Sequence, residues 1–124
     1  MEFKDKEITL LLGQNERLIK QNQELLYGEL EQRKVLKKAI SFFGEEMQIF
    51  VAVEEMGELL QALSKFKRHE GDVNNIIEEI ADVEIMMQQL CLIFDCSNDV
   101  ATMKSQKIER LKEKIKRLEN ERNE

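Results

Sequence analysis

Apolar residues recur every three or four positions along most of the chain, the spacing of one face of an α-helix. This pattern predicts helices over residues 3–31, 34–43, 45–68, 73–94 and from 97 or 98 towards 122. Gly44 is placed to end one helix, while Gly71 and Asp72 are placed to end and begin the two helices of residues 45–94. The short connection predicts an antiparallel helix hairpin. The expected fold is therefore all-α, a helical bundle around this hairpin with long N- and C-terminal helices.

The first helix is expected to form a separate segment, residues 1–31, ahead of a domain over residues 34–122. It carries a heptad of apolar residues at Ile8, Leu11, Leu18 and Leu25. Asn15 and Asn22 share the heptad phase of Ile8, a position where Asn often fixes the register of coiled coils. The helix is expected either to self-associate or to pack on its own domain, and the sequence leaves both alternatives open.

A seven-residue phrase appears twice in the hairpin. Residues 53–59 are VEEMGEL and residues 77–83 are IEEIADV, which match in residue type at every position. Residues three apart share a helix face, so Glu55 and Glu58 are neighbours, as are Glu79 and Asp82. The expected buried stripes beside these acids are Ala52, Met56, Leu59 and Leu63 in one helix, and Ile76, Ile80, Val83, Met87, Leu90 and Phe94 in the other. An antiparallel hairpin would bring all four acids within a turn of one another, at the edge of the buried stripes.

Four converging carboxylates repel one another, and a bound cation is the usual compensation. Carboxylate oxygens suit a hard ion such as Mg²⁺ or Mn²⁺, and Mg²⁺ held in this way commonly also contacts substrate phosphates. The alternative is that the acids are ordinary solvated charges on amphipathic helices. His69 is the only histidine and lies in the turn, so the Glu-x-x-His pairs of a di-iron bundle are missing.

The order of three segments resembles the MazG-like all-α nucleoside triphosphate pyrophosphatases. These segments are FFGEEMQIFVAVEEMGELLQALSKFKR, NIIEEIADVEIMMQQLCLIF and KIERL, and the resemblance covers roughly residues 34–117. It implies that Glu55, Glu58, Glu79 and Asp82 hold Mg²⁺, with Glu54 and Glu78 as candidates to orient the attacking water. It also implies that Gln48 contacts the base or sugar, and that Lys107, Arg110 and more weakly Lys104 contact the triphosphate.

The implied reaction converts a nucleoside triphosphate to the monophosphate and pyrophosphate in a homo-oligomer, a dimer or tetramer. Each implied role has a plainer alternative: a surface glutamine for Gln48 and a solvated basic face for the C-terminal cations. A narrower substrate, dUTP alone, is compatible with the same residues. The competing class of function is a helical self-association module without enzymatic activity.

The overall composition limits the partners. The chain has 124 residues, 42% of them hydrophobic, 35% charged and none proline, which fits one mostly helical domain. A net charge of −6 argues against nucleic acid as a partner. No apolar run is long enough for a membrane span and the N-terminus is too charged for a signal peptide, so a cytoplasmic protein is expected. Cys91 and Cys96 lack the spacing of a zinc site and are expected to be reduced thiols.

Overall fold

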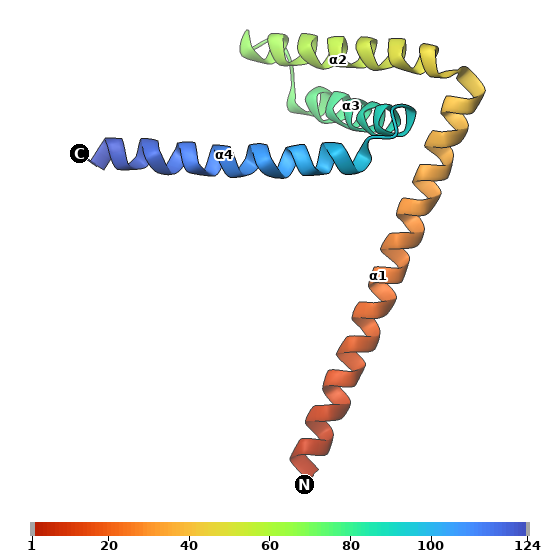
Figure 1. Cartoon of the computed structure of the whole chain (residues 1–124), viewed down its shortest axis with the longest axis vertical. Coiled ribbons are helices and arrows are strands. Elements are labelled where there is room, and N and C mark those ends of the chain that lie inside the picture. Colours follow the sequence, from red (N-terminus) through yellow and green to blue (C-terminus); the bar gives the residue numbers. More distant parts are fainter. Residues whose placement is uncertain (1, 124) are drawn as a thin grey trace. The chain divides into compact units, whose positions relative to one another are not determined.

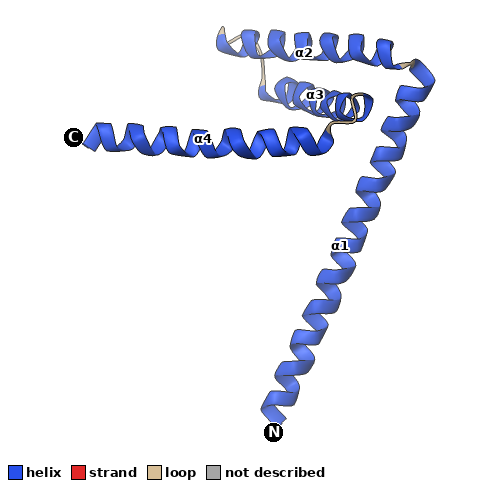
Figure 2. Cartoon of the chain, in the orientation of Figure 1, coloured by secondary structure: helices blue, strands red, loops and turns tan. Residues whose placement is uncertain are grey.

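The computed structural model describes residues 2–123, and within this range the chain folds into four helices without a strand (Figure 1, Figure 2). These are α1 (Glu2–Phe43), α2 (Glu45–Lys67), α3 (Val73–Ile93) and α4 (Ser97–Asn123). The predicted all-α class is confirmed. The chain divides into two compact units, one up to Ala39 and one from Ile40 onwards. No helix in residues 2–123 has a stretch long and apolar enough to cross a membrane.

Helix α1 differs from the expectation of two shorter helices. It runs without interruption from Glu2 to Phe43, through the predicted break near residues 32–33. Gln32 and Arg33 are good helix formers, and nothing in this part of the sequence stops a helix. The helix ends at Gly44 as predicted, where a φ of 95° lies in the left-handed region that glycine tolerates.

The turn between α2 and α3 uses a different residue from the one expected. His69, and not Gly71, takes the left-handed conformation, with a φ of 61°. The N–H groups of His69 and Glu70 donate to the carbonyl oxygens of Phe66 (3.0 Å) and Lys65 (2.9 Å), which completes a Schellman motif. A Cβ on Gly71 would lie 3.2 Å from Lys65 Cβ, so this glycine permits a close approach. The predicted cap is confirmed, because the Asp72 side chain accepts a hydrogen bond of 2.8 Å from the Asn75 N–H.

The turn between α3 and α4 has the same construction. Asp95 has a φ of 49°, and the Cys96 N–H donates to the Cys91 carbonyl oxygen over 3.0 Å. Ser97 is the first residue of α4 and so does not precede the helix as a cap. The turn also brings the two free thiols together: burial raises the pKa of Cys96, and the neighbouring Cys91 raises it further.

Helices α2 and α3 lie side by side as the predicted antiparallel hairpin (Figure 1). The face of α2 that α3 covers carries Gln48, Ala52, Glu55, Leu59 and Ala62, which repeat at the spacing of a heptad. The opposing face of α3 includes Ile76, Glu79, Val83, Met86 and Leu90. The interface therefore runs through the acidic residues and contains small and polar side chains rather than a purely apolar core.

This position of the interface confirms one part of the predicted buried stripes and corrects the other. The residues that are buried or half-buried, as predicted, are Ala52, Leu59, Ile76, Val83 and Leu90. The side chains of Met56, Leu63, Ile80 and Met87 remain 37–46% exposed, and Phe94 is 62% exposed. Each helix has a broad apolar surface, and a two-helix hairpin covers only one side of it. Glu55 and Glu79 consequently lie near the middle of the interface rather than at its edge, while the larger apolar residues face outwards.

Candidate metal centre

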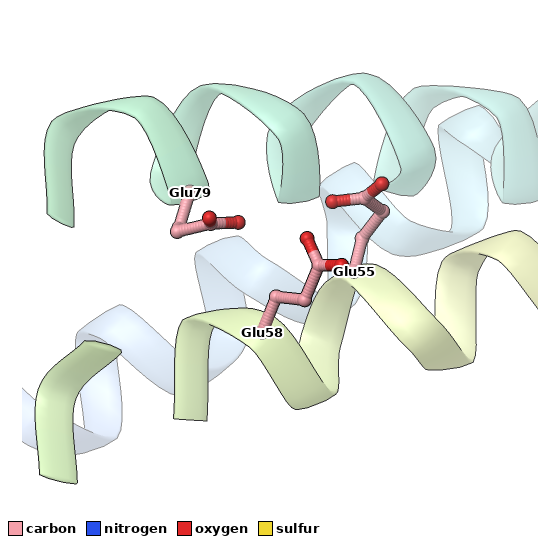
Figure 3. Close-up of side chains that lie close together, drawn as sticks. All are labelled: Glu55, Glu58 and Glu79. Carbon is pink, nitrogen blue, oxygen red and sulfur yellow. The ribbon is translucent and has the colours of Figure 1, made fainter. Parts of the chain in front are cut away.

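Three carboxylates converge between α2 and α3. Glu55 and Glu58 extend from successive turns of α2, and Glu79 extends from α3 towards them (Figure 3). One oxygen from each lies within 4.8 Å of the others. The spacing of three residues places the first two on one face of α2, and the antiparallel hairpin adds the third. The repeated phrase thus contributes one shared cluster rather than two separate ones.

Two oxygen atoms of this cluster have no hydrogen-bond partner. Oε2 of Glu55 and Oε2 of Glu79 are both shielded from solvent and unpaired. An ionised carboxylate normally keeps its oxygens hydrated, hydrogen-bonded or coordinated to a cation. These two oxygens are therefore positions at which a proton, a water molecule or a cation could be accommodated.

The electrostatic environment favours protonation of the same two groups. Burial raises the pKa of Glu55, and the charges of Glu58, Asp82 and Glu79 raise it further. Burial is also the largest cause of the raised pKa of Glu79, followed by Glu58, Asp82 and Glu78. All of these neighbouring charges are negative. A cation at this position would remove the repulsion and return the carboxylates to their ionised form.

Asp82, the fourth predicted ligand, lies on the same face of α3 and is half-buried. Its carboxylate is near enough to raise the pKa of both Glu55 and Glu79, although it is outside the group of three converging oxygens. It is thus a fourth carboxylate beside the group of three.

The donor set and spacing fit a hard divalent cation. Oxygens that share Mg²⁺ at about 2.1 Å lie within roughly 4.2 Å of one another, so rotations of the side chains would bring the three oxygens onto one ion. Three carboxylates without nitrogen or sulfur favour Mg²⁺ or Mn²⁺ over softer metals. Water and substrate oxygens would supply the remaining ligands.

The other predicted site residues lie elsewhere. Glu54 and Glu78 are exposed. Lys104, Lys107 and Arg110 are also exposed, and the first two lie beside apolar residues of α4 such as Met103, Ile108 and Leu111. Within residues 2–123, no basic side chain is among the charges that shift the pKa of Glu55 or Glu79. In the part of the chain that the structure describes, helix α4 makes no backbone contact with α2, which carries Glu55 and Glu58.

A polar region continues along the hairpin beyond the acids. Gln48 is only 6% exposed, which excludes a surface glutamine, and Gln89 is 4% exposed with its Oε1 unpaired. Sequence reasoning missed Gln89. The available signal was its spacing, because Gln89 follows Asp82 by seven residues, as Gln48 precedes Glu55 by seven. Both glutamines therefore extend the faces that carry the acids.

Comparisons with protein-family models, with curated proteins and with solved structures found no match. The resemblance of residues 34–117 to the MazG-like enzymes stays a prediction.

Proposed function

We propose that this protein is a Mg²⁺-dependent nucleoside triphosphate pyrophosphohydrolase, with Mn²⁺ as an alternative ion. The observation that carries the proposal is the convergence of Glu55, Glu58 and Glu79 with two buried, unpaired oxygens. This feature occurs where the sequence repeats its acidic phrase. Glu55 and Glu79 are half-buried between α2 and α3, whereas Glu58 is exposed at the edge of the cluster.

In this proposal Glu55, Glu58 and Glu79 hold the ion, and Asp82 adds a fourth negative charge beside it. When bound, Mg²⁺ would neutralise phosphate charge and make water more acidic. Glu54 or Glu78, the exposed acids next to Glu55 and Glu79 in the chain, is the candidate to orient the attacking water, whose proton passes to solvent. The water oxygen bonds to the α-phosphorus while the bond to the oxygen bridging the β-phosphorus breaks. The products are a nucleoside monophosphate and pyrophosphate.

The remaining contacts to substrate require a second copy of the chain. Lys107 and Arg110 are proposed to neutralise phosphate charge, and Lys104 contributes more weakly. Because these cations do not influence the acids within one chain, we propose that a neighbouring subunit of a homodimer or homotetramer supplies them. Exposed apolar residues on all three helices from residue 45 onwards support such an assembly, among them Met56, Leu60, Ile77, Ile80, Leu111 and Ile115.

The buried Gln48 is proposed to contact the base or sugar, and a preference for dUTP is the narrower form of the proposal. Neither nucleic acid nor a membrane is proposed as a partner. The net charge of −6 disfavours the first, and the hydropathy of the helices disfavours a spanning segment.

Pyrophosphate release from a panel of NTPs and dNTPs tests the reaction. Wild type is expected to release pyrophosphate with Mg²⁺, and Glu79→Gln is expected to lose that release. Glu84→Gln is the matched control, because Glu84 is an exposed acid on the same helix. No release from any nucleotide by well-folded wild type, with either Mg²⁺ or Mn²⁺, would contradict the enzymatic proposal.

The second candidate is a helical self-association module, which the exposed apolar seams also favour. In α4 the predicted seam of Ile108, Leu111, Ile115 and Leu118 is 41–56% exposed. A module of this kind predicts concentration-dependent stability without an effect of divalent metal. Thermal denaturation with and without Mg²⁺, at two protein concentrations, distinguishes the self-association module from the metal-dependent enzyme.

A further inference from the structure

Helix α1 presents a heptad of apolar side chains on one face. Ile8, Leu11, Leu18 and Leu25 occupy the a and d positions of this heptad and are 53–66% exposed. Three further apolar residues, Leu12, Ile19 and Leu26, lie beside the seam at the e positions and are 57–58% exposed. A single helix of 42 residues has no interior in which to bury such a stripe. The seam therefore requires a partner surface.

We infer that the partner is α1 of a second copy of this chain, aligned in parallel and in register. The inference goes beyond the proposed reaction, because α1 carries none of the residues assigned to it. It commits to direct pairing of the two seams through Ile8, Leu11, Asn15, Leu18, Asn22 and Leu25.

The two asparagines select this arrangement. Asn15 and Asn22 occupy a positions, and in a parallel, in-register pair each faces its own copy across the seam. Their amides then hydrogen-bond to each other inside an otherwise apolar interface. In an antiparallel pair, a positions face d positions, which are Leu11, Leu18 and Leu25. Each amide would then lie against leucine and lose hydrogen bonds to water.

The flanking positions are compatible with the parallel pair. The g positions are Glu7, Gln14, Gln21 and Gly28, and they face the e positions Leu12, Ile19, Leu26 and Arg33 of the other copy. No two like charges meet in this arrangement. The apolar e residues widen the contact beyond a strict a and d seam.

The available area is sufficient for a stable contact. Seven apolar side chains on each helix, each exposing on the order of 100 Å², give roughly 1,400 Å² in the pair, within the usual range for a specific interface of about 1,200–2,000 Å². The contact thus does not depend on the surfaces of α2, α3 or α4.

Disulfide crosslinking of the full chain tests orientation and register together. Cys91 and Cys96 are first replaced by serine, and a single cysteine is then introduced as Leu11→Cys, Leu25→Cys or Lys20→Cys. The first two positions lie in the seam about 21 Å apart along the helix. Lys20 is exposed at an f position and is the control. A small-molecule disulfide is the oxidant and accepts two electrons and two protons for each crosslink.

A parallel, in-register pair predicts that Leu11→Cys and Leu25→Cys each crosslink to themselves at least tenfold faster than Lys20→Cys at low micromolar protein concentration. An antiparallel pair would place each d position opposite an a position of the other copy, so neither Leu11→Cys nor Leu25→Cys would crosslink with itself faster than Lys20→Cys; this result overturns the inference. Equal rates at all three positions, or no crosslinking while circular dichroism shows intact helix, also overturn it. Pyrophosphate release by the same variants is scored separately, so failure here is distinguishable from failure of the proposed reaction.

Discussion

The substitution Glu55→Gln is expected to stabilise the protein in the absence of divalent metal and to destabilise it, relative to wild type, when metal is present. Without divalent ions, Glu55→Gln should unfold at a higher temperature than wild type. The substitution keeps the shape of the side chain and removes one of three carboxylates whose oxygens lie within 4.8 Å of one another. It also supplies an amide that can donate a hydrogen bond to Glu58 or Glu79, which the carboxylate of Glu55 cannot do.

With metal present, wild type should have the higher melting temperature of the two proteins. A metal concentration 100 times the Kd stabilises the folded state by about 2.7 kcal/mol. For a unit of the size of Ile40–Glu124, this raises the Tm of wild type by about 10–20 °C. If the lost ligand weakens binding about 100-fold, the same concentration stabilises the variant by about 0.4 kcal/mol, a rise of only about 2–3 °C.

Thermal denaturation followed by circular dichroism measures both effects. MgCl₂ and MnCl₂ are compared with NaCl at equal ionic strength, at one fixed protein concentration because the assembly is expected to be oligomeric. Glu54→Gln is the control, since it removes the same charge from the neighbouring exposed position. Equal metal-dependent shifts in wild type and Glu55→Gln, or a lower Tm of the variant without metal, would refute the assignment of Glu55 as a ligand.

Further predictions concern pH and the backbone. The pKa values of Glu55 and Glu79 are raised above 4.5 in the folded protein, so the folded state binds more protons than the unfolded chain. Without metal, the free energy of unfolding should therefore fall as pH rises from 4.5 through the raised pKa values. Urea titrations of Glu55→Gln should show a smaller decline than those of wild type. His69→Gly should stabilise the protein by on the order of 0.5–1 kcal/mol in urea denaturation, because it relieves a left-handed non-glycine residue. Gly71→Ala should destabilise it in the same assay by about 1 kcal/mol, since the new Cβ would lie 3.2 Å from Lys65 Cβ, and an unchanged midpoint would contradict this close contact. Gly28→Ala should raise the melting temperature of α1, because its new Cβ would meet nothing within 4 Å and alanine is the better helix former by about 1 kcal/mol; a lower melting temperature would contradict this expectation.

Local signals in the sequence were sufficient to locate the two helices of the hairpin. Apolar periodicity located α2 and α3 to within about one residue of their observed ends, and Asp72 acts as the predicted cap. These features depend on short-range interactions within a turn or two of the chain, which the sequence states directly. The same locality explains the error in α1, where a predicted break at residues 32–33 had no glycine or proline to produce it.

The repeated acidic phrase also indicated the cluster before the structure did. Residues three apart on a helix must share a face, and a short turn must bring the two helices alongside each other. The convergence of Glu55 and Glu58 with Glu79 follows from these two facts. Their chemistry as oxygen ligands is likewise a property of the residue types.

Only the tertiary structure decided which faces meet. The sequence placed the acids at the edge of stripes that include Met56 and Ile80, whereas these two side chains are exposed in the hairpin and Glu55 and Glu79 are half-buried in its interface. Rotation of one helix about its axis changes no local hydrogen bond, and broad apolar surfaces allow several rotations. The choice depends on contacts between segments more than twenty residues apart, and it is this choice that places Gln89 and two unpaired carboxylate oxygens inside the interface.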